Sequence, residues 1–353
     1  MNLFVSAQAP TQATHDIDSD TTVDFRMSLN DTPDAGPKRI HLAASGGAGQ
    51  RLDQFLASRL AGISRTRIQR WIALGAVQVD QRIRLPSLRL SGFEQIEVEP
   101  QPLESESAFQ PDPIPLDIVH QDADVVVIDK PVGLVTHPAP GHWRGTLMNG
   151  LLHADPKAAR LPRAGIVHRL DRDTSGLLVC ARSERAFTAL SAQLAERRMG
   201  RRYLAIAGGI TAHQGSIDGR IGRDERNRLR MAVVQPPHGK EARTHFKRLA
   251  TSEAGNASAV LCRLESGRTH QIRVHMASIG HPLVGDSLYG GQPLANFGRQ
   301  ALHAWQLRFE HPADQRPCCF DAPIPADLSQ LAAQLGMSLP ETAPVLPEEQ
   351  ASA

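Results

Sequence analysis

The residues best suited to chemistry lie in one short polar segment, residues 168–176, with the sequence HRLDRDTSG. Asp171 stands near its centre, between two arginines. A carboxylate can act as a nucleophile or as a base, and a guanidinium beside it can keep it ionised. Apolar runs at 165–167 and 177–179 predict two short strands that hold the segment between them. A charged loop in such a place indicates a structural ion pair, a functional site, or both.

Elements with clear patterns precede and follow this loop. Four consecutive apolar residues within 124–131 predict a buried strand, and the run RRYLAIAG at 201–208 predicts another. Between them, residues 183–198 predict a helix that places Phe187, Leu190 and Leu194 on one face. Further short apolar runs, at 231–234, 244–249 and 258–264, also predict strands.

A last helix is expected over residues 269–279, where Ile272, Met276 and Ile279 form the buried stripe and Gly280 ends it. Arg273 projects beside this stripe. Many short strands with few helices indicate an α+β domain over residues 116–335, built on a mixed, largely antiparallel sheet.

A separate small α/β domain is predicted at 50–99. Apolar residues recur with helical spacing from Leu52 to Leu60, Ser64 can cap a second helix that ends near Gly75, and Val77 and Val79 begin a hairpin. Residues 51–90 hold eight Arg and two Asp, and residues 220–248 hold nine Lys or Arg and three acids, so each stretch carries a net charge of +6. Two basic stretches favour contacts with phosphate groups.

The remaining segments are predicted to lie outside the two domains. Residues 1–36 hold six Asp and one Arg, and the leader 1–49 is expected to be disordered. The proline-rich stretch 100–115 suits a linker, and the tail 336–353 is expected to be mobile. No segment is apolar enough to span a bilayer, and four cysteines without a CxxC pair suit a reduced, cytoplasmic protein.

The loop sequence HRLDRDTSG resembles the signature of the RluA family of RNA pseudouridine synthases, in particular its branch that acts on ribosomal RNA. Three more segments are similar to that family, at 133–141, 201–209 and 267–290. In the small domain, the patterns RLDQFL and SRTRIQRWI resemble the S4 RNA-binding module. The resemblance implies a pseudouridine synthase fold preceded by an S4 domain.

The resemblance also implies roles for individual residues. Asp171 would be the catalytic residue, Arg273 its cationic partner, and Tyr203 the tyrosine that stacks near the target base. Arg169 would enter the RNA helix beside the flipped nucleotide. The arginines expected to contact the RNA backbone are Arg172 in the loop and Arg65, Arg67 and Arg70 in the small domain. Whether Asp171 attacks C1′, attacks C6 of the base or removes a sugar proton stays open at this point.

The predicted function is therefore isomerisation of specific uridines in large-subunit (23S) ribosomal RNA, or its precursor, by a monomer that needs no metal or organic cofactor. His270 and His275 do not predict a metal site, because they are five residues apart and face different sides of a helix. Two alternatives remain: a non-catalytic RNA-binding or ribosome-assembly factor with the same scaffold, and an enzyme of this kind directed to tRNA.

Overall fold

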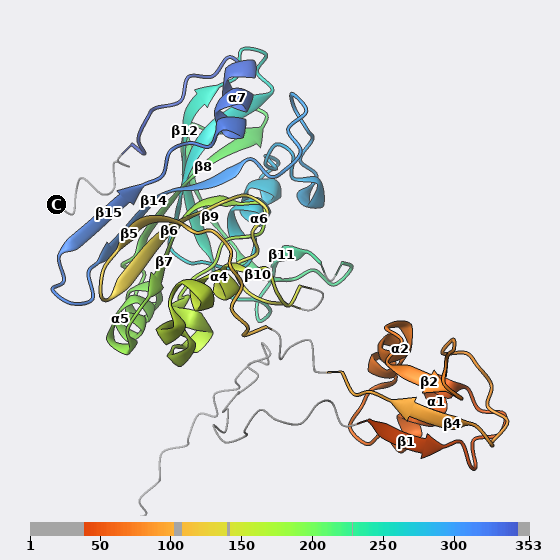
Figure 1. Cartoon of the computed structure of the whole chain (residues 1–353). Coiled ribbons are helices and arrows are strands. Elements are labelled where there is room, and N and C mark those ends of the chain that lie inside the picture. Colours follow the sequence, from red (N-terminus) through yellow and green to blue (C-terminus); the bar gives the residue numbers. More distant parts are fainter. Residues whose placement is uncertain (1–38, 102–107, 140–141, 228, 345–353) are drawn as a thin grey trace, which may run out of the picture. The chain divides into compact units, whose positions relative to one another are not determined.

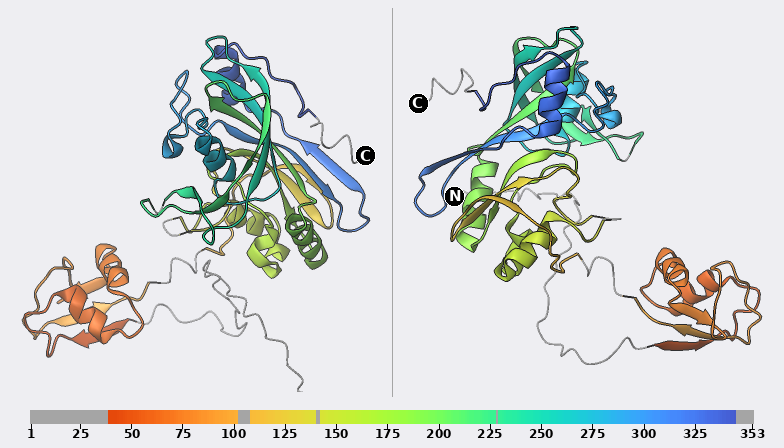
Figure 2. Two further views of the ribbon diagram at one scale, coloured as in Figure 1. Left: turned by 180° about the vertical axis from the view of Figure 1, so that it is seen from behind. Right: turned by 45° about the horizontal axis from the view of Figure 1, so that its top comes forward.

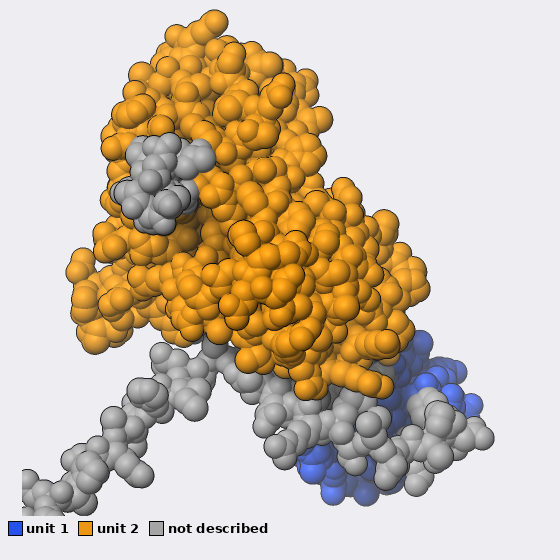
Figure 3. All heavy atoms as spheres, turned by 90° about the vertical axis from the view of Figure 1, so that its left-hand side faces the viewer, with its two compact units in different colours: residues 1–101 blue, residues 102–353 orange. Residues whose placement is uncertain are grey.

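The structure is a computed structural model, and it describes residues 39–101, 108–139, 142–227 and 229–344 (Figure 1). The chain divides into two compact units, residues 1–101 and residues 102–353, which Figure 3 draws in different colours. The predictions of a disordered leader over 1–38, of a linker at 102–107 and of a mobile tail at 345–353 lie outside the described residues.

The smaller unit contains two helices and one antiparallel sheet. Helices α1 (Leu52–Arg59) and α2 (Arg65–Ala73) pack through Phe55, Leu56 and Ile68 on the inner side of strands in the order β1-β4-β2-β3. The strands are β1 (Ile40–Ala43), β2 (Val77–Val79), β3 (Arg82–Ile83) and β4 (Gln95–Val98).

The two helices and the hairpin predicted in this unit are confirmed. The Ser64 side chain accepts a hydrogen bond from the amide of Arg67 at 3.4 Å and so caps α2. Asp80 and Gln81 both have positive φ, as a tight two-residue hairpin turn requires. Strand β1 comes from the part of the leader that lies nearest to the helices, so the sheet begins before residue 50.

The larger unit is built on a nine-stranded sheet. Eight strands follow the order β5-β6-β7-β14-β8-β13-β12-β9, and the ninth, β15, pairs with β14. Only the β7–β14 pair is parallel among the strand pairs of the described residues. This confirms a mixed, mainly antiparallel sheet. The strands are β5 (Asp117–Gln121), β6 (Val125–Lys130), β7 (Ser175–Ala181), β8 (Gly200–Gly208), β9 (Gln214–Asp218), β12 (Arg243–Thr251), β13 (Ala257–Leu264), β14 (Leu302–Glu310) and β15 (Pro317–Asp321). A separate hairpin joins β10 (Arg220–Arg223) to β11 (Met231–Val234).

Helices cover both faces of the sheet (Figures 1 and 2). Helices α4 (Leu147–Ala154) and α6 (Gln271–Ser278) share one core with the inner side chains of β6, β7, β8 and β13. Helices α5 (Glu184–Ala195) and α7 (Ala326–Gln334) pack on strand residues that point to the other face. Three short 3-10 helices complete the secondary structure of the described part, η1 (Pro156–Arg160), η2 (Pro162–Gly165) and η3 (Ser287–Tyr289).

Most predicted elements of this unit are present with slightly different ends, but two predictions are wrong. Residues 165–167 do not form a strand: Gly165 ends η2, and Ile166 makes only an isolated bridge to Cys180. The side chain of Ile279 is 39% exposed, because α6 ends at Ser278 and Ile279 lies at its C-cap.

Ordered contacts extend into both ends of the larger unit. The Asn149 amide on α4 donates hydrogen bonds to the carbonyls of Ala108 and Gln110, within the stretch predicted as a linker. In the stretch predicted as a mobile tail, Met337 and Ala343 are buried in the cores next to α7. These contacts tie residues 108–110 to α4 and residues 337–343 to the cores next to α7.

Candidate active site

The loop that carries Asp171 is anchored at several backbone positions. The hydroxyl of Thr136 donates to the Leu170 carbonyl at 2.7 Å and accepts from the Leu170 amide at 3.3 Å. The Gly133 amide donates to the Arg172 carbonyl at 2.9 Å. Strand β7 then begins directly after the loop. Its Gly176 has φ +108° and lies so close to β14 that an added Cβ would be 2.2 Å from the Ala304 oxygen.

Lys130, the last residue of β6, also binds the backbone of this loop. Its ammonium donates to the carbonyls of Pro131 at 2.8 Å, Leu134 at 2.9 Å and Arg172 at 3.0 Å. The residue is fully buried, and burial lowers the pKa of this ammonium to about 8, so it stays charged at neutral pH. Its three N–H donors each bind a backbone carbonyl, and the bond to Arg172 ties the end of β6 to the loop.

Asp171 is paired with Arg273 of α6. Nη1 of Arg273 donates to Oδ2 of Asp171 at 3.0 Å. The other edge of the guanidinium binds the buried Asp286 through two hydrogen bonds, from Nε at 2.7 Å and from Nη2 at 2.9 Å. Arg273 therefore lies between two carboxylates, one fixed and buried, the other partly open to solvent.

The pair of carboxylates determines the electrostatics of Arg273. Burial opposes its charge, but the hydrogen bonds to Asp286 and the field of Asp171 outweigh burial and raise the pKa of the guanidinium. Arg273 is thus a permanent cation. Asp286 shares this cation with Asp171, so Arg273 alone does not balance both carboxylates.

Asp286 was not found by sequence reasoning. It lies in the segment 267–290 that carries the family resemblance, but no residue pattern pairs it with Arg273. The available signal was Gly285, directly before it, whose φ is +73° and whose added Cβ would be 2.2 Å from the Arg299 oxygen. A glycine required by such a close approach fixes the backbone from which Asp286 reaches Arg273.

Tyr203 lies on the same face of the sheet as the α6 helix. It is buried in the core that β8 forms with α4 and α6. Burial raises the pKa of its hydroxyl, the nearby Arg201 opposes this effect, and the carboxylate of Asp171 adds to it. Asp171 and Arg273 are thus joined by a hydrogen bond, and Tyr203 lies in the core that also contains Leu170 and Ile272, where the field of Asp171 reaches its hydroxyl.

His168 has a structural contact. Its Nε2 accepts a hydrogen bond from the amide of Val179 at 3.2 Å, which requires an unprotonated Nε2. Burial and the nearby Arg201 lower the pKa of the imidazole to about 3. His168 is therefore neutral and serves to hold the loop against β7.

The two loop arginines face outward. Arg169 is exposed, and Arg172 pairs with its neighbour Asp173 through hydrogen bonds of 3.0 to 3.2 Å. Both guanidinium groups lie near the rim of the site and can meet a polyanion.

The arginines of the smaller unit differ in their surroundings. Asp53 is fully buried and accepts hydrogen bonds from Arg51, Arg65 and Gln69; these bonds outweigh burial and hold the pKa of its carboxyl below the usual range. Arg65 thus helps to hold α2 on α1. Arg67 stacks on Trp71, 5.0 Å from the ring centre, and donates to the Gln101 carbonyl, and Arg70 is exposed.

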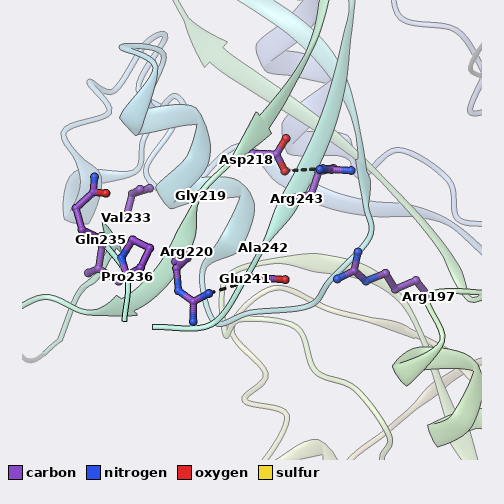
Figure 4. Close-up of a pocket in the computed structure, with 11 residues that line it drawn as sticks. Arg197, Asp218, Gly219, Arg220, Val233, Gln235, Pro236, Glu241, Ala242 and Arg243 are labelled. Carbon is purple, nitrogen blue, oxygen red and sulfur yellow. Dashed lines mark hydrogen bonds and ion pairs between the residues drawn. The ribbon is translucent and has the colours of Figure 1, made fainter. Parts of the chain in front are cut away.

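A hollow of about 490 Å³ lies among β9, β10 and the start of β12, in the second basic stretch (Figure 4). Arg197, Arg220 and Arg243 line it, each in an ion pair with an acidic residue, together with the apolar Val233 and Pro236. Arg268, three residues before the start of α6, donates to the Glu241 carbonyl in its wall. The hollow therefore shares a wall with the segment that leads to Arg273.

No group of three or more His, Cys, Asp or Glu side chains in the described part of the chain is arranged to hold a metal ion. The predicted lack of a cofactor stays a prediction. Nor does any described helix have the length and apolar character to cross a membrane.

Comparisons with known proteins agree on one family. The family profile of RNA pseudouridylate synthase matches residues 124–278, and that of the S4 domain matches residues 50–96. The chain is 48% identical over 299 residues to "Ribosomal large subunit pseudouridine synthase D" of Neisseria meningitidis serogroup A, covering 82% of this chain and 79% of that protein. A protein of the same name from Xylella fastidiosa is 44% identical. The match covers 85% of this chain and 93% of that protein. Among solved structures, "Human RNA Pseudouridylate Synthase Domain Containing 4" has the same fold, with a TM-score of 0.52 at 23% identity, over 64% of this chain and 94% of that one.

The role of Lys130 can be tested through stability. We expect Lys130→Met to lower the free energy of unfolding of the larger unit by about 3 kcal/mol, because buried carbonyls lose their donor. Chemical denaturation followed by fluorescence measures this difference, with the exposed Lys157→Met as the matched control. An unchanged transition in Lys130→Met would show that the ammonium does not hold the loop.

Proposed function

The chain belongs to the RNA pseudouridylate synthase family, and from this premise we propose that it converts specific uridines of large-subunit ribosomal RNA into pseudouridine. The substrate class follows from the relatives. Each of them is named as a large-subunit enzyme, and this chain matches most of its length. The observation that carries the catalytic part is the held carboxylate: Asp171 is fixed through Oδ2 by Arg273, and its Oδ1 is not part of that hydrogen bond.

The reaction needs only such a site. The bond between uracil N1 and ribose C1′ breaks, the base turns while it stays bound, and C5 bonds to C1′. The proton on C5 is lost and N1 is left to carry one, so no other reactant is consumed. A charged carboxylate can serve as a nucleophile or a base, and the three possible first steps of Asp171 are all compatible with a free Oδ1.

Arg273 and Tyr203 have supporting roles in this proposal. Arg273 orients Asp171, and Asp286 prevents the guanidinium from turning away. Tyr203 forms part of the wall against which the base can stack, and its hydroxyl is available near Asp171 to help remove the C5 proton.

A uridine in folded RNA must leave its stack before it can reach Asp171, at a cost of a few kcal/mol. Arg169 is exposed beside Asp171 and can fill the gap that the base leaves, since a planar cation both stacks and attracts phosphate. Arg172 can contact the backbone at the rim. The arginine-lined hollow of Figure 4 offers a further place for phosphates.

The smaller unit would bind RNA, while the chemistry takes place in the larger unit. Its match to the S4 family and its exposed arginines on α2 support this role. We further propose that the protein works as a monomer in the cytoplasm, where ribosomal RNA is made in bacteria. A non-catalytic binding factor is disfavoured, because binding alone gives no reason to hold a carboxylate between a buried guanidinium and open space. A tRNA substrate would be the alternative within the same chemistry.

Replacement of the catalytic carboxylate gives the first functional test. Asp171→Asn should abolish pseudouridine at particular positions of large-subunit ribosomal RNA, because an amide is neither a nucleophile nor a base. Carbodiimide modification followed by primer extension maps these positions in cells that carry only the variant. Asp173→Asn is the matched control from the same loop, and we expect it to keep the sites.

Two results would oppose the proposal. If all ribosomal sites persist with folded Asp171→Asn while sites in tRNA disappear, the substrate is tRNA. If no pseudouridine changes in either RNA, the chain acts as a binding factor.

The smaller unit is tested by the salt dependence of RNA binding. We expect the double variant Arg67→Gln, Arg70→Gln to bind more weakly and to flatten the plot of log K against log salt by about 1 to 2 in slope, since each lost phosphate contact removes about 0.9. Arg65 is left intact in this variant, because the buried Asp53 would lose one of its hydrogen-bond donors from α2. An unchanged slope would remove these two arginines from the RNA interface, and thermal unfolding checks that the unit stays folded.

A further inference from the structure

The second oxygen of Asp171 faces a histidine that the proposed chemistry has not used. While Oδ2 is hydrogen-bonded to Arg273, Oδ1 lies 3.8 Å from Nε2 of His270. His270 is the residue directly before α6, so it and Arg273 approach the carboxylate from the same element. The distance is longer than a hydrogen bond but short enough for a small movement to make one.

A chain of two hydrogen bonds fixes the tautomer of this histidine. The amide of Met231 donates to the hydroxyl of Tyr289 at 2.9 Å, and the same hydroxyl lies 2.8 Å from Nδ1 of His270. Because the amide can only donate, the phenol oxygen accepts from it and its own hydrogen is free to go to Nδ1. Nδ1 is then the acceptor, and the ring proton sits on Nε2, which faces Asp171.

The opposite tautomer is unfavourable here. It would place a hydrogen on Nδ1 and leave the phenol hydrogen without this acceptor. It would also point the lone pair of Nε2 at the carboxylate oxygen, and two electron-rich atoms at 3.8 Å repel each other. Only the Nε2–H tautomer gives Met231, Tyr289, His270 and Asp171 a donor facing an acceptor at each step of this hydrogen-bond chain.

The imidazole is also held in place mechanically. His270 has φ 56° and ψ 22°, a left-handed conformation that turns its side chain toward the site before α6 begins. Its ring packs edge-to-face on Tyr289 with centroids 5.7 Å apart, and the guanidinium of Arg273 lies 5.1 Å from the centre of the same Tyr289 ring. Tyr289 therefore positions both groups that face Asp171.

The charges around His270 keep the imidazole neutral near pH 7. Burial lowers its pKa, Asp171 and Asp286 act in the opposite direction, and Arg273 and Arg169 add to the lowering. Tyr289, whose own pKa is raised by burial, also stays uncharged. A neutral imidazole can restrain the carboxylate as a hydrogen-bond donor without cancelling its charge.

We propose that His270 is a positioning residue: its Nε2–H, set by the relay from Met231 through Tyr289, holds Oδ1 of Asp171 in the orientation needed to act on the uridine. This inference rests on the proposed function, because it assigns Oδ1 as the reacting oxygen. The relay also links the carboxylate to the β10–β11 hairpin, since Met231 is the first residue of β11.

A matched pair of variants separates the relay from simple packing. His270→Asn suits the left-handed backbone, but its side chain is too short to reach Oδ1. His270→Gln places an amide N–H at about the position of Nε2. We expect His270→Asn to lower kcat about tenfold with KM unchanged within about twofold, and His270→Gln to stay within about threefold of the parent protein. His281→Gln, three residues beyond the end of α6, is the control and should have no effect.

The pH profile adds a readout that packing would not change. Burial lowers the pKa of His270, so kcat of the parent protein should stay constant as the pH falls to the usual pKa of a histidine. Below that pH, kcat should decrease, because a second proton on Nδ1 breaks the hydrogen bond from Tyr289. The part of this fall that comes from the imidazole should be absent in His270→Gln.

Nitrogen NMR of the full-length protein, labelled at the histidine rings and without RNA, tests the tautomer directly. The His270 signals, assigned by their loss in His270→Asn, should show a protonated Nε2 and an unprotonated Nδ1, and Tyr289→Phe should disturb this state. A protonated Nδ1, or full kcat in folded His270→Asn, would overturn the inference. If the parent protein modifies no RNA at all, the proposed function fails, and the NMR result still decides the tautomer.

Discussion

The site depends on one interaction, the guanidinium of Arg273 held between the buried Asp286 and the half-open Asp171. A carboxylate taken out of water needs a cation, and a cation shared with a second carboxylate cannot neutralise both. Asp286 binds two nitrogens of Arg273 and so fixes the third for Asp171. The result is an aspartate that is oriented by its partner and still negatively charged, which is the state that attack on a nucleotide or removal of a proton requires.

The fold brings these groups together from distant parts of the chain. Asp171 comes from the loop before β7, Arg273 from α6 and Asp286 from the turn after it, and 102 residues separate the first two. The parallel pairing of β7 with β14 fixes the end of the loop, and Lys130 and Thr136 fix its middle through backbone carbonyls. Helices α4 and α6 pack in the core that also contains Tyr203, so the same apolar contacts stabilise the sheet and place the tyrosine.

Sequence reasoning predicted what local patterns encode. The strand within 124–131 and the capped helix after Ser64 followed from short motifs, and the family resemblance pointed to Asp171 and Arg273, which the structure pairs. It failed where the outcome depends on backbone geometry or distant partners. Residues 165–167 are apolar like a strand, but the positive φ of Arg163 and Ala164 turns the chain, and only Ile166 meets a neighbour. Asp286 and Tyr289 have no spacing that pairs them with Arg273 or His270, since those contacts exist only after α6 has docked.

The most direct test of the central claim removes the charge of Asp286 alone. Single-turnover release of tritium from RNA labelled at uridine C5 reports the reaction at the site, and RNA affinity is measured in parallel. We expect Asp286→Asn to slow release at least tenfold with unchanged affinity, because Arg273 loses its fixed partner and no longer orients Asp171. Asp314→Asn, which removes the carboxylate that faces the exposed Arg316, should release tritium at the parent rate. Release at the full rate by folded Asp286→Asn would contradict the account.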